Sequence, residues 1–256
     1  MTDATTDRHL LTREAYPDST NLNARVSIYE FKEPHDDFWS FVLGFADWPD
    51  GARVLDVGCG PGSYLARVGG VGIDLSPGMA REARRHGPTA VADVCALPIE
   101  SASIDRLLAP HMLYHAPDLD RGAAELRRVV KPGGVGLVVT NGRQHLVHLV
   151  DQLSEATGTE APVRFVDRFT LENGLPLLER YFEHVRLEHF RGALVVPDAG
   201  PVVRYAESCR ALYETQLPPG ATWSDSMQRF GALVEDEISQ TGAWRTPTHS
   251  GVFVCR

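Results

Sequence analysis

A glycine-rich segment that follows an acid carries the sharpest chemical signal in the sequence. Asp56 ends an apolar run, and glycines follow at alternating positions, Gly58, Gly60 and Gly62. Glycine lets the backbone approach a ligand closely, and a helix that starts after such a loop offers free N–H groups. The rival interpretation is a dinucleotide site of the GxGxxG type, but Ser63 stands where its third glycine belongs. The Asp56 carboxylate would also repel a pyrophosphate, whereas it would stabilise a ligand that carries an ammonium and a sulfonium.

Two more acids follow later apolar runs. Asp74 comes near the end of the run 71–75, and Asp93 near the end of the run 90–94. The carboxyl ends of parallel strands form the crevice where open α/β sheets bind ligands. There, Asp74 would accept both hydroxyls of a ribose, and Asp93 would accept an adenine amino hydrogen while the next backbone N–H serves a ring nitrogen. Any one of these acids could merely cap a turn, but together with the glycine loop they predict a nucleoside ligand.

The elements that must position these residues alternate in type from Ala52 onward. Short β-branched runs alternate with helical stretches, which favours a mostly parallel sheet covered on both faces. Ser76 followed by Pro77 predicts a helix start, and Asp118 predicts another. The segment from Lys131 to Gly134 predicts a tight reversal. The expected strands are 53–57, 71–75, 90–94, 104–109, 135–140, 185–190, a short 193–196 and an edge strand 251–255; the expected helices are 61–68, 77–86, 118–130, 146–153, 171–182, 201–217 and 225–240.

Composition sets broad limits on the function. The chain has 256 residues, of which 43% are hydrophobic and 23% charged, which is typical of a globular protein. Its net charge of −9 argues against tight binding to nucleic acid, which needs a basic surface. Four cysteines without a CxxC pair favour a reducing compartment, and we expect a cytoplasmic protein because neither a signal peptide nor an apolar span of about 20 residues is visible.

The order and spacing of several segments resemble the class I S-adenosylmethionine-dependent methyltransferases, in the broad group that includes many small-molecule enzymes. The matching segments, between about Arg53 and Thr140, are DVGCGPG, VGIDLSPGM, ADVCALP, APHMLYHAPD and LRRVVKPGG. The resemblance implies an α/β fold with a Rossmann-like seven-stranded sheet whose last strand is antiparallel, with an N-terminal helical lid and a helical insertion before the final strand. It also implies S-adenosyl-L-methionine as the cofactor and no metal. We expect a single domain, with a lid over 1–50, a cofactor-binding core over 51–142 and substrate-side helices and closing strands over 143–256.

The resemblance also implies which residues bind the cofactor. Asp56, Gly58 and Gly60 would flank the methionine moiety, Asp74 would bind the ribose, Leu75 and Met79 would pack on the adenine, Asp93 and Val94 would bind its edge, and Ala109 would face the methionine amine. The segment from Asn21 to Phe31 is similar to an N-terminal helix found in part of the group. On that helix Arg25 would hold the cofactor carboxylate, and Tyr16 would close over it.

Candidates for proton removal lie just after the expected strand 104–109. His111, Tyr114 and His115 would border the methyl group, and a histidine titrates near neutral pH. His111 is the first candidate base, while His115 is the weaker one because it could simply hold its loop. His145 and His148, three residues apart beside an apolar helical stripe, could face the substrate or pair on a metal, but a solvated polar face is favoured because no convergent carboxylates accompany them. No GxSxG or phosphate-loop motif occurs.

These residues predict methyl transfer to a small molecule, at oxygen, nitrogen or an activated carbon, in secondary metabolism. Three alternatives stay open: a tRNA or protein acceptor, a non-catalytic scaffold that retains the cofactor fold, and a bound cofactor whose charge assists another reaction. The acceptor pocket would come from the first fifty residues and from about 163–242, and the oligomeric state is open. The aromatic residues near the N-terminus would either cover an apolar acceptor or pack inside the lid; they are Tyr16, Tyr29, Phe31, Phe38, Trp39, Phe41 and Trp48.

Overall fold

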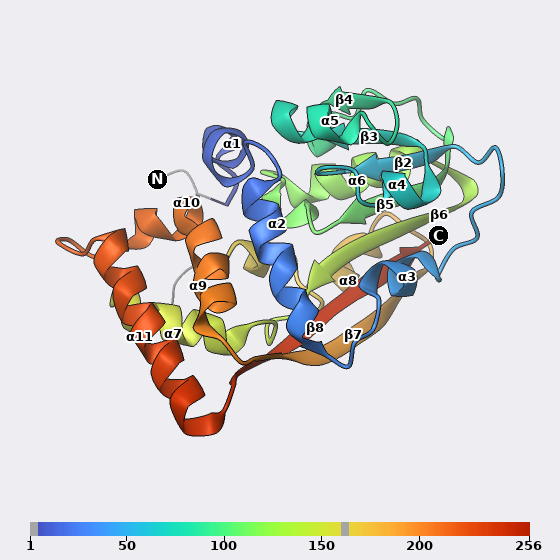
Figure 1. The fold of residues 1–256 in the computed structure, drawn as a ribbon. Helices are drawn as coiled ribbons and strands as arrows, with labels where there is room; N and C mark the ends of the chain where they lie inside the picture. Colours follow the sequence, from blue (N-terminus) through green and yellow to red (C-terminus); the bar gives the residue numbers. More distant parts are fainter. Residues whose placement is uncertain (1–4, 160–163) are drawn as a thin grey trace.

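One eight-stranded sheet organises the molecule, which is described by a computed structural model over residues 5–159 and 164–256 (Figure 1). The strand order is β1-β7-β8-β6-β5-β2-β3-β4. The strands are β1 (Lys32–Glu33), β2 (Val54–Val57), β3 (Val71–Asp74), β4 (Thr89–Val91), β5 (Ile104–Pro110), β6 (Val130–Asn141), β7 (Val185–Val196) and β8 (Trp244–Cys255). Strands β4, β3, β2, β5 and β6 pair in parallel, and β8 is antiparallel to both of its neighbours. The expected Rossmann-like class with an antiparallel last strand is confirmed.

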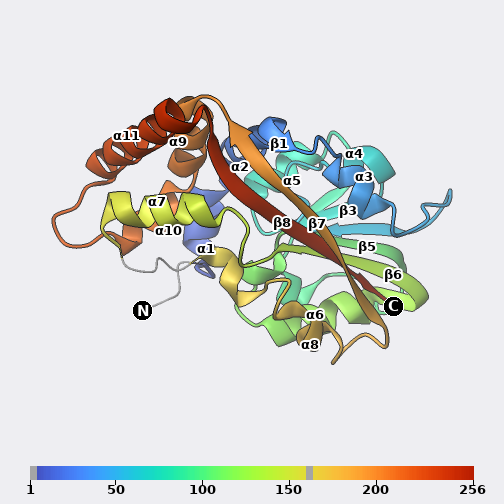
Figure 2. The ribbon, with the colours of Figure 1, turned by 90° about the horizontal axis from the view of Figure 1, so that it is seen from below.

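Alternation along the central strands explains why helices cover both faces of the sheet. Leu107 and Ala109 of β5 lie in one hydrophobic core, whereas Leu108 between them lies in another. Successive side chains of a strand point to opposite faces, so a strand that is apolar throughout must be covered twice. Helices α6 (Leu119–Val129) and α8 (Gly174–Leu178) lie on one face, and α3 (Phe38–Leu43), α4 (Leu65–Val68) and α5 (Pro77–Ala83) lie on the other (Figure 2).

The predicted helix starts are confirmed by the capping bonds. The Ser76 hydroxyl accepts the N–H of Met79 at 3.3 Å, and Pro77 is the first residue of α5. The Asp118 carboxylate accepts the N–H of Arg121 at 2.9 Å at the start of α6. Side-chain acceptors at these positions satisfy N–H groups that the first helical turn leaves without partners.

Several boundaries differ from the sequence prediction on the β8 side of the sheet. The segments 185–190 and 193–196 form one continuous strand, β7, because all twelve of its residues pair with β8, from Val185 with Cys255 to Val196 with Trp244. The final strand is longer than expected and lies between β6 and β7, not at an edge. The edge and the eighth strand are supplied by β1, which pairs antiparallel with β7.

Other predicted elements are shorter or differently built. The segment 131–134 is not a reversal but the irregular start of β6, where the register against β5 shifts and Gly133 has a φ of +77°. The expected helix 171–182 is reduced to α8, and the expected helix 201–217 is divided at Cys209 into α9 (Ala199–Ser208) and α10 (Arg210–Tyr213). Strand β4 ends at Val91, earlier than expected, so Asp93 lies beyond it.

A second hydrophobic core joins the N-terminal segment to the helical insertion. The N-terminal helices are α1 (Arg8–Leu10), a π-type turn (Leu11–Ala15) and α2 (Thr20–Ser27); the partners are α7 (Val147–Thr157), α9, α10 and α11 (Trp223–Thr241). Leu11, Ile28, Leu149, Phe230 and Trp244 are all buried in this core. In Figure 1 the helices α7, α9 and α11 gather around the far ends of β7 and β8, and α2 lies between them and the rest of the sheet. The N-terminal helices and the helices of the insertion, though distant in the sequence, therefore pack into one helical layer at this end of the sheet. No helix among the described residues is long and apolar enough to cross a membrane.

Candidate active site

A cavity of about 700 Å³ lies at the carboxyl ends of the parallel strands. Its lining includes the loops after β2, β3, β4 and β5, helix α2, and residues of β1, β7 and β8. This is the edge at which open α/β sheets bind ligands, and the volume lies within the range of small-molecule sites. The strand ends, the N-terminal helices α1 and α2, and Tyr205 of α9 thus line one continuous cavity.

The glycine loop after β2 takes a backbone path that other residues would resist. Gly58 and Gly60 have φ angles of +70° and +52°. A Cβ at Gly58 would lie 2.5 Å from the Cβ of Met112, which leaves no room for a side chain. The N–H of Gly58 donates to the carbonyl of Ile73 at 2.7 Å and so ties the loop to β3. Glycine at these positions is a requirement of the loop, in agreement with the prediction from the sequence.

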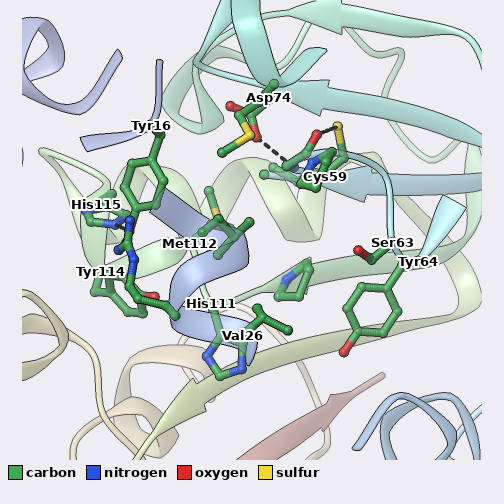
Figure 3. Close-up of a pocket in the computed structure, with 18 of the residues that line it drawn as sticks. Tyr16, Val26, Cys59, Ser63, Tyr64, Asp74, His111, Met112, Tyr114 and His115 are labelled. Carbon is green, nitrogen blue, oxygen red and sulfur yellow. Dashed lines mark hydrogen bonds between the residues drawn. The ribbon is translucent and has the colours of Figure 1, made fainter. Parts of the chain in front are cut away.

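Asp74 lines the cavity at the end of β3 and is held by backbone donors. Its Oδ1 accepts the N–H of Ser76 at 2.8 Å, and its Oδ2 accepts the N–H of Gly60 at 2.9 Å, the bond drawn in Figure 3. Burial raises the pKa of this carboxyl, and the N–H donors partly oppose that effect. Each oxygen retains acceptor capacity, so an oriented carboxylate is available to two hydroxyl donors.

Asp56 lies beneath the same loop and outside the cavity lining. It is fully buried, and neither of its carboxylate oxygens has a hydrogen-bond partner among the described residues. Burial, with a contribution from Asp74, raises the pKa of Asp56 to about 8. A buried carboxylate without partners is costly unless a positive charge is near. No compensating partner for this carboxyl exists among the described residues, and the prediction from the sequence is that a cationic ligand supplies one.

The residues predicted to surround an adenine lie together in the cavity lining, whereas Ala109 does not. Leu75, Met79, Asp93 and Val94 all line the cavity. Asp93 caps the short 3-10 turn 94–96, and its Oδ1 accepts the N–H of Cys95 at 2.8 Å. Its Oδ2 also pairs with Arg8 of α1, a contact between the lid and the core that the sequence did not signal. Ala109 lies in the core of the sheet instead of the lining.

A hydrogen-bonded chain links the N-terminal lid to the loop after β5. The Arg25 guanidinium donates to the Tyr16 hydroxyl at 3.1 Å, and Tyr16 Oη lies 3.2 Å from Nε2 of His115. The Nδ1 of His115 lies 2.9 Å from the carbonyl oxygen of Thr5. Because a carbonyl only accepts, Nδ1 carries the proton and Nε2 accepts from Tyr16. Figure 3 shows Tyr16 and His115 side by side, across the cavity from Tyr64.

The two candidate bases have different surroundings. His111 lines the cavity in a left-handed backbone conformation, with a φ of +53°, and its ring lies 5.7 Å from that of Phe38. Burial lowers the pKa of His111 to about 4. Burial also lowers the pKa of His115 to about 4. Both of its ring nitrogens, however, take part in the hydrogen bonds to Tyr16 and Thr5 described above. Tyr114 is buried, which raises its pKa well above the usual 10 and keeps it protonated.

The interpretation of His145 and His148 as a solvated polar face is wrong for the first of them. His145 is buried; its Nδ1 accepts the N–H of His249 at 3.1 Å, and its Nε2 lies 2.8 Å from the Tyr29 hydroxyl. His148 pairs with Glu237 of α11 at 2.6 Å. Among the residues that the structure describes, no group of three or more His, Cys, Asp or Glu is arranged to hold a metal ion.

Several lining residues had no signal in the sequence. Lys32 comes from β1, Phe190 from β7, and Thr248 and Ser250 from β8. They reach the cavity because the long antiparallel pair β7–β8 brings its middle beside the end of β6. Only the pairing of distant strands could identify them.

Comparison with known proteins places these features in context. Residues 55–138 match a family described as "Methyltransferase domain". The chain is 40% identical over 111 residues, 39% of its length and 37% of the relative's, to a 23S rRNA (guanine(748)-N(1))-methyltransferase of Streptomyces fradiae. It is 26% identical over 208 residues, 78% of its length and 75% of the relative's, to a malonyl-[acyl-carrier protein] O-methyltransferase of Yersinia pestis. The chain spans less than half the length of the first relatives that it matches.

The fold also has solved counterparts. A phosphoethanolamine N-methyltransferase 2 of Haemonchus contortus, in complex with S-adenosyl-L-methionine, superposes with a TM-score of 0.57 at 20% identity, over 97% of this chain and 59% of that one. At this identity the likeness shows a shared fold.

Proposed function

We propose that this chain, which carries a class I S-adenosylmethionine-dependent methyltransferase domain, transfers a methyl group from S-adenosylmethionine to a small-molecule acceptor. The observation that carries the proposal is one continuous cavity, which joins the loops after β2, β3 and β4 to a region lined by aromatic side chains, those of Phe38, Trp39, Tyr64 and Phe190. A volume of about 700 Å³ suits a cofactor and a compact acceptor together.

The residues described above fit S-adenosylmethionine on the chemistry of their side chains. When bound, this cofactor supplies a methyl carbon that its sulfonium activates. The buried charge of Asp56 would stabilise the cation, and Asp74 would accept the ribose hydroxyls. Leu75 and Met79 offer apolar surface for the adenine, and Val94 follows Asp93 at its edge. Arg25 is buried in the lid and lines the cavity, where the carboxylate of the cofactor would need a cation.

We assign to the N-terminal lid the exclusion of water and the alignment of the acceptor. Tyr16, held by Arg25 and His115, closes the lid over the cavity. Aligning two reactants supplies much of the rate of a displacement reaction. His111 is neutral at pH 7, so its imidazole can accept a proton from an acceptor hydroxyl or amine as the methyl group is transferred, although a pKa of about 4 makes it a weaker base than an exposed histidine. We assign His115 to holding the lid because both of its nitrogens are engaged.

The acceptor half of the cavity favours an aromatic or apolar molecule. Phe38, Trp39, Tyr64 and Phe190 line it, and Phe38 and Phe190 pack with ring centroids 5.0 Å apart. We place this acceptor in secondary metabolism, on the resemblance to small-molecule methyltransferases. A nucleic-acid acceptor is less well supported, because the net charge is −9 and the alignment with the rRNA enzyme covers 39% of the chain.

The test has two steps. Calorimetric titration with S-adenosylmethionine and, separately, with NADH should show binding of the first alone. Transfer of a labelled methyl group is then measured with phenols, amines and carboxylic acids, and with total ribosomal RNA as the competing acceptor. Labelling of a small acceptor alone would support the proposal. Absence of S-adenosylmethionine binding, or labelling of RNA alone, would overturn it.

A further inference from the structure

Lys32 is a buried cation at the acceptor end of the cavity. It is 5% exposed and lies in β1 opposite Leu194 of β7. Its Nζ donates to the carbonyl of Pro34 at 2.8 Å and lies 4.3 Å from the centre of the Phe190 ring. The nearest paired acid is Asp36, at 4.0 Å, whose side chain is 56% exposed. The charge of this lysine is thus only weakly compensated inside the cavity.

The backbone of β7 makes room for the ammonium group. A Cβ at Gly192 would lie 3.0 Å from Lys32 Nζ and 2.6 Å from the carbonyl of Glu33. Gly192 pairs directly with Thr248 of β8, and opposite residues of an antiparallel pair present their side chains on the same face. The ammonium therefore lies on the face of the sheet that carries the Thr248 side chain.

Thr248 supplies an independent indication of a ligand. It lines the cavity and is 4% exposed, and its Oγ1 has no hydrogen-bond partner among the described residues. A buried hydroxyl without a partner costs stability, so its partner is expected to come from the ligand. Ser250, two residues along the same face, instead donates to Asn141 Oδ1 at 2.7 Å.

We infer that Lys32 and Thr248 form a subsite for a carboxylate on the methyl acceptor, with the Phe190 ring packed beside the apolar part of that molecule. The ammonium and the hydroxyl would each donate to the carboxylate. The inference rests on the proposed function and specifies its substrate class, an aromatic or apolar acid.

Of the lining acids near this end of the cavity, Asp36 alone pairs with Lys32 among the described residues, at 4.0 Å, the limit of an ion pair. Glu30, Asp36 and Asp37 are exposed, and Asp37 caps α3 by accepting the N–H of Trp39 at 3.0 Å. They lie in contact with solvent, whereas Lys32 is enclosed. Burial lowers the pKa of Lys32, with Asp36 opposing the effect, and a bound carboxylate would favour the charged form.

The position in the sheet also sets the size of the acceptor. Lys32 Nζ lies over β7, and β7 is three strands away from β5 in the sheet. His111 comes directly after the last residue of β5. At about 4.8 Å per strand, the carboxylate would lie on the order of 14 Å from β5. The His111 and Lys32 side chains both line the cavity, so the nucleophile and the carboxylate of the acceptor would be separated by less than this distance. A ring with a chain of several carbons would fit between them.

The test uses para-hydroxyphenyl alkanoates of increasing chain length, each paired with its neutral carboxamide. Binding to the full chain is measured by calorimetry with and without S-adenosylhomocysteine. At the best chain length the acid should bind at least tenfold tighter than its amide. Lys32→Met should weaken acid binding about 10–100-fold, to the level of the amide, and Thr248→Val should weaken it about fivefold. Neither variant should change the affinity for S-adenosylmethionine.

Lys131→Met is the matched control, because the other lysine of the chain pairs with Asp105 at 2.7 Å outside the cavity lining. The inference is overturned if no acid of the series binds, if acid and amide bind equally, if the preference survives Lys32→Met, or if matched amines bind better. Failure of the proposed function looks different: acids would bind through Lys32 while S-adenosylmethionine neither binds nor transfers its methyl group.

Discussion

Tyr16 and His115, 99 residues apart in the chain, are joined by a hydrogen bond of 3.2 Å between the phenol and Nε2. The bond connects the N-terminal lid to the loop after β5 at the wall of the cavity. Its direction is set from both ends, because Arg25 donates to Tyr16 and Thr5 accepts from His115. This pair of side chains therefore joins the N-terminal lid to the wall of the cavity, in addition to the contact between Arg8 and Asp93.

Removing the Tyr16 hydroxyl should loosen the lid. We expect Tyr16→Phe to weaken S-adenosylmethionine binding about fivefold, since one hydrogen bond contributes about 1 kcal/mol, and to speed proteolysis within the first thirty residues. Calorimetry and limited trypsin digestion measure the two effects. Tyr181→Phe is the control, because that hydroxyl bonds Asp120 at 2.7 Å away from the cavity. Equal behaviour of the two variants would refute the role of Tyr16.

Removing the Asp74 carboxylate should weaken binding of the cofactor by about 1–3 kcal/mol, through the loss of hydrogen bonds to the ribose. Asp74→Ala is compared with the control variant Asp105→Ala. In the wild type the Asp105 carboxylate pairs with Lys131, outside the cavity lining. Calorimetric titration with S-adenosylmethionine gives both affinities. An unchanged affinity in Asp74→Ala would exclude the ribose role.

Asp56 should make cofactor binding depend on pH. Its pKa is raised to about 8, so the carboxyl is mostly protonated at pH 7 in the free protein. A cation favours the ionised form, so binding should release a proton, and affinity should rise by up to about tenfold per pH unit below pH 8 and level off above it. Calorimetry in buffers that differ in their heat of ionisation measures the number of protons released on binding. Asp56→Asn should abolish the release, and release that persists in this variant would assign it elsewhere.

The same raised pKa has a consequence for stability. A carboxyl with a higher pKa in the folded state than in the unfolded state contributes stability at low pH and loses it as the pH rises from about 4 to 8. The free energy of unfolding of the cofactor-free protein should therefore fall over this range more steeply in the wild type than in Asp56→Asn. Urea unfolding at several pH values measures the difference, and parallel profiles would contradict it.

His111 should affect turnover and leave cofactor binding nearly unchanged. We expect His111→Asn to lower kcat about 10²–10⁴-fold if the imidazole takes the proton of the acceptor. Asparagine is chosen because it tolerates the left-handed conformation, with φ at +53°, better than most residues do. Because the pKa is lowered to about 4, wild-type kcat should lose this contribution only as the pH falls towards 4. A normal kcat in the variant would leave alignment as the main source of the rate.

The parts of the site that depend on short stretches of chain could be predicted from the order of the residues. Asp56, Gly58 and Gly60 occur within one strand end and its loop, and Asp74 within the next, so local spacing and backbone conformation predict their place. The capping bonds of Ser76 and Asp118 are local in the same way. The matching order of these motifs was enough to predict the parallel core.

The contacts between distant segments could be identified only in the folded molecule. The pairing of β7 with all of β8 brings Thr248 beside Gly192, and β1 then places Lys32 over the same strand. His145 could not be told from a surface residue because its burial depends on Tyr29 of the lid, 116 positions away. The physical reason is that strand pairing and core packing depend on the whole chain, whereas periodicity and motifs report a residue's immediate neighbours.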